Sequence, residues 1–310
     1  MKITAIFLSF TMIFSLMGCG TAAVQNLEST VPVNETEEII ISKDAAVSYG
    51  ERALENADVL PDVTEGMEEY QGFQMDNVLH AERDGDIHYH IYVPDSDGSN
   101  GPYALYVTLP GYGGLYFQGV GVNLQTEKFA FEAQKYNENM IIVAPQLGDW
   151  GETSANQTIA LVKYLLDVYN IDAAQFYASG YLGGGETMSL VLEKAPELFT
   201  AYLHCSSQWD GDYAPVVEHW LPVYLVVGEH DEYYGADPTK EAYAAMYELY
   251  EAQGLSKAEI DTLLILDVKA HEYFTRQGAS NEHGGGGLFA FDEEMMGWLF
   301  SQTKEGSMVR

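Results

Sequence analysis

The sequence predicts an α/β fold: a mainly parallel sheet with helices on both faces and an antiparallel N-terminal hairpin. Strand-like apolar runs alternate with helix-like stretches from residue 103 onward, and parallel strands need such crossover helices between them. The 310 residues are 47% hydrophobic, which is ample for the core of one large domain. A strand–turn–helix around Leu182 marks the centre of this arrangement.

The elements are expected in a simple order along the chain. An antiparallel start at 70–81 and 86–93 is joined by the turn Arg83-Asp84-Gly85. Further strands are expected at 103–109, 140–144, 175–179, 201–205, 223–227 and 263–268. Helices are expected at 44–57, 125–136, 154–169, 184–194, 238–253 and 288–302. We divide the chain into a signal segment (1–18), a tether with a short helix (19–60), one domain (61–302) and a tail (303–310).

Charge limits the partners of this chain. Lys and Arg number 14 against 47 Asp and Glu, a formal net charge of −33. Such a surface repels phosphate backbones and anionic lipid surfaces, so nucleic acid is not an expected partner. The plain interpretation of the acidity is a well-solvated surface.

The first residues have the pattern of an export signal. One basic residue, Lys2, precedes the short apolar run 3–17, which is too short for a good membrane span. The sequence Leu16-Met17-Gly18-Cys19 resembles the bacterial lipobox, in which the cysteine is lipidated. This resemblance implies secretion across the cytoplasmic membrane and a lipid anchor at the cell surface. The alternatives are an ordinary signal peptide or an uncleaved anchor with an incidental Cys19. Cys205 then has no disulfide partner and is expected as a small buried residue.

The strand at 175–179 runs through Gly180-Tyr181-Leu182-Gly183-Gly184 directly into a helix. This is the layout of the nucleophile elbow, G-x-S-x-G, in which the central serine is the attacking group. Leu182 occupies that central position. The glycines suit a sharp strand-to-helix reversal, which needs little side-chain bulk and often a positive φ.

Three further segments follow predicted strands, where an open α/β sheet places its ligand crevice. Leu109-Pro110-Gly111-Tyr112-Gly113-Gly114 is a glycine-rich turn whose amides can face an oxyanion, and the natural donor pair is the amide of Gly183 with Tyr112 or a neighbour. The alternative is a turn that is merely tight.

Asp231 follows the strand at 223–227 and is the candidate acid that would orient a histidine, with Glu229 and Glu232 as competitors. His283 is the candidate base, because the glycines at 284–287 would let it approach the elbow closely. His271 is expected to cap or pack the end of the last strand. The order elbow, acid, histidine differs from that of trypsin-like and subtilisin-like enzymes.

From about residue 61 to 302 the chain resembles an α/β-hydrolase, nearest to secreted bacterial esterases and prolyl-oligopeptidase-like hydrolases. The carrying motifs are LPGYGG, GYLGGGE, GEHDEYYG and NEHGGGGLFAFDEEMMGWLF. The resemblance implies a serine hydrolase of ester or peptide bonds in which Asp231 and His283 complete the triad, with no cofactor and a small ester or peptide as substrate. Leu182 departs from the family pattern.

Leucine has no atom that can attack a carbonyl, so acyl-enzyme chemistry is impossible at this position. Three explanations stay open: a Ser→Leu change in an otherwise working hydrolase, a natural pseudoenzyme that keeps the pocket as a cell-surface ligand-binding site, or direct activation of water by Asp231 and His283. Ser206 and Ser207 end a neighbouring strand but belong to no motif. No metal site is expected, because His88 and His90 alternate on one strand without a third ligand at the right spacing.

Overall fold

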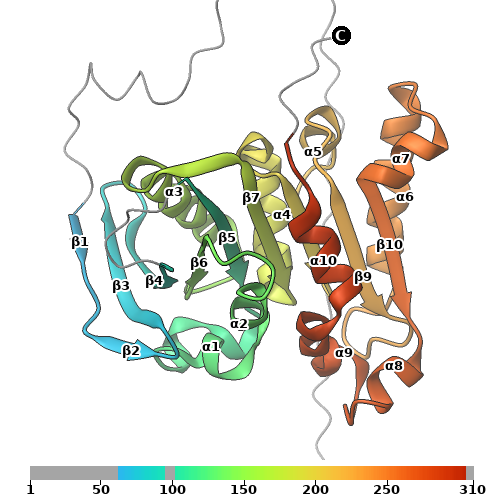
Figure 1. Ribbon diagram of the computed structural model, residues 1–310. Helices are drawn as coiled ribbons and strands as arrows, with labels where there is room; N and C mark the ends of the chain where they lie inside the picture. The colour runs from blue at the N-terminus through green and yellow to red at the C-terminus, as the bar shows by residue number, and fades with distance from the viewer. Residues whose placement is uncertain (1–61, 95–101, 305–310) are drawn as a thin grey trace, which may run out of the picture. The chain divides into compact units, whose positions relative to one another are not determined.

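The computed structural model describes residues 62–94 and 102–304 (Figure 1). The chain divides into two units, residues 1–57 and 58–310, and the fold below is that of the second unit. The expected helix at 44–57 and Cys19 lie outside the described residues.

A ten-stranded mixed sheet forms the centre of this unit. Its order is β1-β3-β4-β6-β5-β7-β8-β9-β10, with β2 beside β3. The pairs from β6 to β10 are parallel, whereas β1 to β4 pair antiparallel with one another and β4 pairs antiparallel with β6. The predicted fold class is confirmed. The strands are β1 (Asp62–Thr64), β2 (Glu68–Tyr70), β3 (Phe73–Ala81), β4 (Gly85–Tyr92), β5 (Tyr103–Leu109), β6 (Met140–Pro145), β7 (Ile171–Tyr181), β8 (Ala201–Cys205), β9 (Val223–Gly228) and β10 (Leu264–Lys269).

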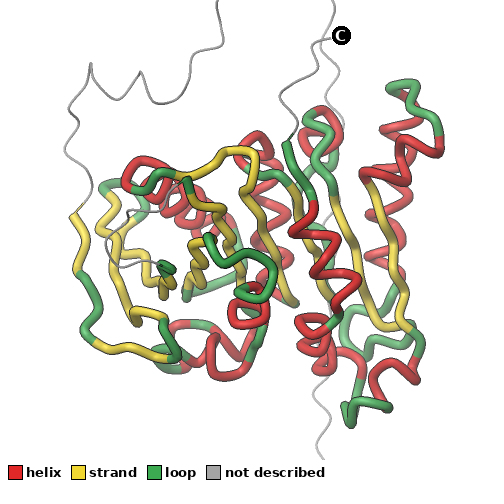
Figure 2. Tube along the Cα trace, viewed as in Figure 1, coloured by secondary structure: helices red, strands yellow, loops and turns green. Residues whose placement is uncertain are grey.

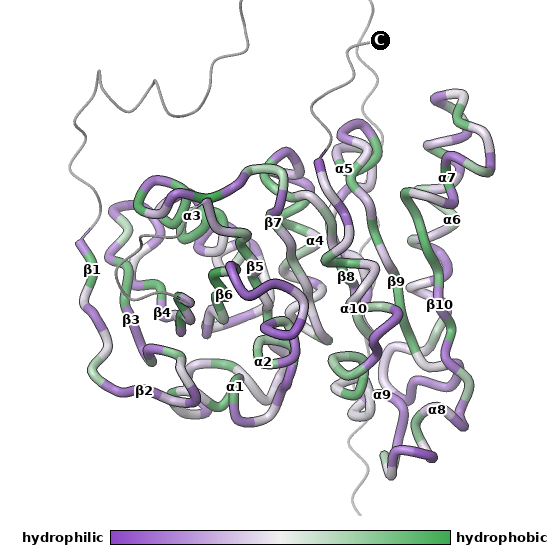
Figure 3. The backbone as a smooth tube through the Cα atoms, in the orientation of Figure 1, coloured by the Kyte–Doolittle hydropathy of each residue, from purple (hydrophilic) through white to green (hydrophobic). Residues whose placement is uncertain are grey.

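Helices cover both faces of the sheet (Figure 2), and each face has its own hydrophobic cluster. One cluster lies under α3 (Glu152–Val168), α4 (Gly183–Lys194), α5 (Ala214–Glu218), α6 (Asp237–Ala252) and α7 (Lys257–Leu263). The other lies under α1 (Val122–Thr126), α2 (Phe129–Ala133), α8 (His271–Thr275), η5 (Gly286–Phe291) and α10 (Glu293–Ser301). Burial on both sides explains why β5, β6, β8 and β9 have no exposed residue, and why the central strands are mostly hydrophobic in Figure 3.

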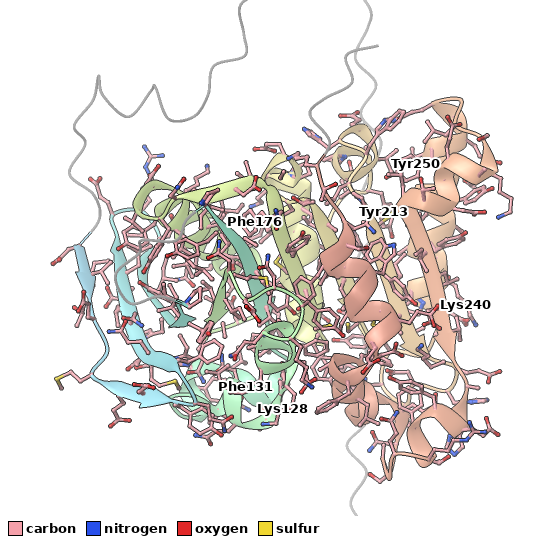
Figure 4. The ribbon with its side chains drawn as sticks, viewed as in Figure 1. Lys128, Phe131, Phe176, Tyr213, Lys240 and Tyr250 are labelled. Carbon is pink, nitrogen blue, oxygen red and sulfur yellow. The ribbon has the colours of Figure 1, made fainter. Side chains whose placement is uncertain are left out.

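The predicted helix at 125–136 is wrong as one element, because the chain forms α1 and α2 with a break at Glu127 and Lys128. Glu127 has an extended backbone there (φ −114°, ψ 154°), and its carboxylate accepts a hydrogen bond from the amide of Gly111. The ring of Phe131 on α2 lies 5.4 Å from the Lys128 ammonium, a cation–π contact at the surface (Figure 4).

The predicted last helix, 288–302, also divides in two. The 3₁₀ helix η5 runs to Phe291, and Asp292 then caps α10 by accepting a hydrogen bond from the amide of Met295. The short elements β1, β2, α5, α7 and α8 were not expected from the sequence. Among the described residues, no helix is both long enough and apolar enough to cross a membrane.

Candidate active site

The turn between β7 and α4 holds Leu182 in an unusual backbone conformation. Its φ is 50° and its ψ is −124°, a backbone conformation that residues other than glycine seldom adopt. Hydrogen bonds fix both sides of this peptide: the amide of Leu182 donates to the carbonyl of Cys205 (3.1 Å), and its carbonyl accepts from Ser207 Oγ (2.5 Å). The turn therefore has the strained geometry of a nucleophile elbow with leucine at its tip.

Close packing explains the glycines around this turn. A Cβ on Gly180 would lie 2.6 Å from the carbonyl oxygen of Gly184, and a Cβ on Gly184 would lie 2.4 Å from that of Leu109. Only glycine permits the first turn of α4 to lie this close to β7 and to the end of β5.

Asp231 and His283 form a hydrogen-bonded pair. His283 Nδ1 lies 3.0 Å from each carboxylate oxygen of Asp231. Asp231 Oδ1 also accepts from the amides of Tyr233 (3.0 Å) and Tyr234 (2.9 Å). Burial alone would raise the pKa of Asp231, but these hydrogen bonds outweigh it and hold the pKa below its usual value. An ionised Asp231 fixes the imidazole through Nδ1 and leaves Nε2 available for proton transfer.

The histidine segment is attached to the elbow. Tyr181, the residue before Leu182, donates its hydroxyl proton toward the carbonyls of His283 (3.1 Å) and Gly284 (3.3 Å). A Cβ on Gly286 would lie 2.7 Å from the Tyr181 ring. These contacts attach the segment that carries His283 to the residue before the elbow tip, although the two are far apart in the sequence.

Two carboxylates hold the acid-bearing loop and the histidine segment together. Glu232 accepts hydrogen bonds from the amides of Glu282 (2.9 Å) and His283 (3.0 Å). In return, the fully buried Glu282 accepts from the amide of His230 (2.6 Å) through Oε2, and its Oε1 lies 2.9 Å from His271 Nδ1. The carboxylates of Glu232 and Glu282 thus make reciprocal bonds on either side of the Asp231–His283 pair. We call this arrangement the reciprocal carboxylate clamp.

Aromatic rings and one acidic side chain border the pair. The rings of Tyr233 and Tyr234 lie 5.0 and 5.5 Å from the imidazole of His283, measured between centroids. The Tyr234 hydroxyl donates to Glu186 Oε1 at 2.6 Å. Burial raises the pKa of Glu186 despite this hydrogen bond, and nearby Asp210 raises it further. The hydrogen bond from Tyr234 explains why an acidic residue lies here, so we assign Glu186 no catalytic role.

The predicted oxyanion donors lie in different environments. Gly183 is buried and begins α4, so its amide has no intrahelical acceptor. A Cβ on Gly183 would lie 2.4 Å from the Trp150 ring, so this ring borders the amide. Tyr112 lies in the 3₁₀ helix η2 (Tyr112–Gly114) with 62% of its surface exposed. The Leu182 side chain packs against Gly111, the residue before Tyr112. A Cβ on Gly111 would lie 2.9 Å from Leu182 Cδ1.

Glu127 lies behind this glycine-rich turn. Its Oε1 accepts from the amide of Gly111 at 2.7 Å. Glu127 lines a cavity of about 10 Å³ together with Asn123, whose buried Oδ1 has no hydrogen-bond partner among the described residues. Part of the residue remains exposed, but burial of the carboxyl end raises its pKa to about 8. A space of this size holds about one water.

The structure brings Leu182, Asp231, His283 and Gly183 to one edge of the sheet. The competitor Glu229 is exposed, and the competitor Glu232 binds backbone amides rather than an imidazole. His271 begins α8 just beyond β10 and contacts Glu282.

Ser207 supports the carbonyl of Leu182, and Ser206 is fully buried. Cys205 is buried and free, and burial raises the pKa of its thiol.

Sequence reasoning missed Glu127 and the second carboxylate of the clamp, Glu282. Glu282 precedes the candidate base directly, so its position next to His283 was the available signal. Glu127 acts across a long sequence separation, and no local pattern marks it.

The order of the strands and the helices on both faces define the class: the chain has the α/β-hydrolase fold. Comparison with family models finds no match, and comparison with curated proteins finds none either. Solved structures do resemble it. A thermostable esterase matches with a TM-score of 0.62 and 21% identity, over 75% of this chain and 64% of that one.

Two further solved structures match at lower TM-scores. S-formylglutathione hydrolase from Staphylococcus aureus gives a TM-score of 0.48 at 10% identity, over 74% of this chain and all (100%) of that one. Oligopeptidase B from Leishmania major gives 0.47 at 14% identity, over 74% of this chain and 37% of that one. This chain therefore spans less than two thirds of the esterase and of oligopeptidase B.

Proposed function

We propose that this chain is a serine-hydrolase scaffold for carboxylic esters or peptide bonds, and that Leu182 at the nucleophile position leaves it inactive or nearly so. The observation that supports the proposal most is the Asp231–His283 pair, with both carboxylate oxygens 3.0 Å from Nδ1, on a segment attached to the elbow. A serine at position 182 would provide the missing nucleophile, His283 its base, and Gly183 one oxyanion donor.

The test is hydrolysis of short aryl esters by the full chain and its Leu182→Ser form. Restoring the serine should raise kcat/KM at least about a thousandfold, because nucleophile and base act as a unit. Leu182→Ala controls for the loss of the leucine side chain. Leu182→Ser/His283→Ala and Leu182→Ser/Asp231→Asn should lose most of the gain. A Leu182→Ser form no more active than Leu182→Ala would overturn the proposal for these esters.

The alternative is a pseudoenzyme that binds a ligand without chemistry. The contact between the Leu182 side chain and Gly111 favours it, because the leucine fills space beside the turn where an oxyanion would lie. Under this alternative, a small ester analogue binds the unmutated chain and the Leu182→Ser form alike, and neither turns it over. Tighter binding of a transition-state analogue to the Leu182→Ser form alone would contradict it.

We also propose that Cys19 anchors the chain in a membrane through a lipid. The support is the sequence Leu16-Met17-Gly18-Cys19. Metabolic labelling with a fatty-acid analogue in a bacterial host should mark the chain but not its Cys19→Ser form, and equal labelling of both forms would refute the anchor.

A further inference from the structure

A pocket of about 260 Å³ lies away from the Asp231–His283 pair. Its walls come from the start of β4, the 3₁₀ helix η3 (Tyr116–Gln118), the loop after β6 and the first turns of α3. A space of this size suits a small ligand. No catalytic candidate lines it.

The pocket lies at the same edge of the sheet as Leu182. Its loop follows β6, and the elbow follows β7, with β5 between the two strands. Two strand spacings place the pocket about 10 Å from the elbow along this edge. The same loop continues into Trp150, the ring that borders Gly183. In an open α/β sheet this edge is where ligands bind.

The polar groups of the pocket are mainly acceptors. Asp86 uses Oδ1 to bind His80 Nδ1 (2.7 Å), and Asp149 uses Oδ1 to accept from Ser154 Oγ (2.5 Å). The Gln157 amide nitrogen donates to a backbone carbonyl (2.9 Å). Oδ2 of each aspartate and Oε1 of the glutamine therefore have no hydrogen-bond partner among the described residues. The hydroxyls of Tyr116 and Thr153 and Nε2 of His88 are further side-chain groups without a partner among the described residues, and each hydroxyl can also accept.

The charge of the lining and the geometry of its aromatic rings limit the chemical class of the ligand further. The lining contains two carboxylates and no lysine or arginine, so it disfavours an anion. One wall is a stacked pair, His88 on Tyr116, with centroids 3.7 Å apart and planes at 20°. Asp76, which does not line the pocket, lies 2.8 Å from His88 Nδ1. An aromatic wall beside two carboxylates suits a cation that carries several N–H donors.

We propose that this pocket binds a small organic cation, with a guanidinium or primary ammonium head between Asp86 and Asp149 and against Tyr116. The head donates to the uncommitted carboxylate oxygens of the two aspartates. Guanidinium fits best, because it is planar, stacks on aromatic rings and donates in a fork that matches a carboxylate. This binding requires no nucleophile and does not rest on the hydrolase proposal.

The experiment is an NMR titration of the full chain, with Leu182 in place, by two probes of the same shape. Methylguanidinium chloride carries the charge, and N-methylurea is its neutral counterpart. Methylguanidinium should shift the amides of Tyr116, Gly148 and Asp149 saturably, and N-methylurea should leave them unchanged. This comparison needs no variant, so it does not depend on whether a mutant folds.

Matched variants then test the two carboxylates. Asp86→Asn and Asp149→Asn should each weaken methylguanidinium binding about two- to fivefold, as expected for partly exposed pairs, and the double variant about tenfold. Asp167→Asn makes the same charge change on α3 outside the pocket and should leave the affinity within about twofold.

Three results would overturn the proposal. One is equal binding of N-methylurea. Another is a double variant that binds as tightly as Asp167→Asn. The third is the absence of a saturable shift at these three amides with the cation.

Discussion

At the scale of single residues, Leu182 combines an apolar side chain with a backbone that favours glycine. Its φ of 50° and ψ of −124° cost a residue with a Cβ on the order of 1–3 kcal/mol. Hydrogen bonds to Cys205 and Ser207 hold it there. The fold therefore keeps a strained elbow although leucine stands at its tip.

This strain predicts that glycine at position 182 gives a more stable protein than alanine, the reverse of their usual order in a helix. Leu182→Gly should unfold with a free energy about 1 kcal/mol higher than Leu182→Ala, because both remove the side chain but only glycine relieves the positive φ. Chemical denaturation measures the difference. At the exposed helical residue Ala244, Ala→Gly should instead destabilise by about 1 kcal/mol. A Leu182→Ala form at least as stable as Leu182→Gly would show that the turn is not strained.

Glu127 predicts a pH dependence of stability. Between pH 4.5 and about 8 the folded carboxyl keeps a proton that the unfolded chain releases, so the folded state binds more protons. Its contribution to the unfolding free energy therefore falls as pH rises through this window, by at most about 1.4 kcal/mol per pH unit.

Glu127→Gln removes this contribution. Compared with the unmutated chain, the variant should gain stability steadily from pH 5 to pH 8 and remain level above that. Thermal unfolding of both forms in parallel measures the difference, which cancels the titration of all other groups. A difference that does not change with pH would mean that Glu127 titrates normally.

At the scale of elements, the reciprocal carboxylate clamp joins the loop after β9 to the segment before η5. Glu232 contributes two backbone hydrogen bonds to this junction, one of them to the amide of His283 itself. The Asp231–His283 geometry therefore depends on more than the two side chains that touch.

Removing one side of the clamp should loosen the pair. Glu232→Ala should lower the unfolding free energy by about 1 kcal/mol and speed the exchange of the hydrogen-bonded Nδ1 proton of His283, followed by low-field proton NMR. Glu229→Ala, at the exposed neighbouring acid, should change neither. Unaltered exchange in Glu232→Ala would show that the pair orients itself without the clamp.

The element scale also shows what the sequence could predict. The strand β5 and the helix α4 were expected within one residue of their bounds, because a continuous apolar run and a glycine-rich turn are local signals. The break at Glu127 was not predictable, because the carboxyl turns away from the helix to bind Gly111, sixteen residues earlier. The cap at Asp292 is a local signal that was overlooked.

The residues of the site also divide into those that local signals predict and those that depend on contacts between distant segments. Asp231 and His283 were proposed from chain order and strand ends, and the structure places them 3.0 Å apart. The role of Glu282 was not predicted, because it depends on how separate loops meet at the sheet edge.

At the scale of the whole molecule, charge is the dominant feature. With 47 acidic against 14 basic residues, the compact state carries a large self-repulsion. Salt screens such repulsion over about 10 Å at 0.1 M.

The melting temperature should therefore rise by several degrees between 10 and about 300 mM NaCl. KCl at equal ionic strength should produce the same rise, since screening does not depend on which monovalent cation is used. A melting temperature that falls with added salt would mean that surface ion pairs outweigh the repulsion.

The central claim is that the scaffold around position 182 is still arranged for acyl transfer. The most direct measurement is covalent labelling of the full chain by a serine-directed fluorophosphonate, read by peptide mass spectrometry. The Leu182→Ser form should gain one adduct on residue 182, Leu182→Ser/His283→Ala should gain almost none, and the unmutated chain none. If the Leu182→Ser form stays unlabelled, or if the unmutated chain is labelled as fast at another residue, then position 182 is not a nucleophile site served by His283.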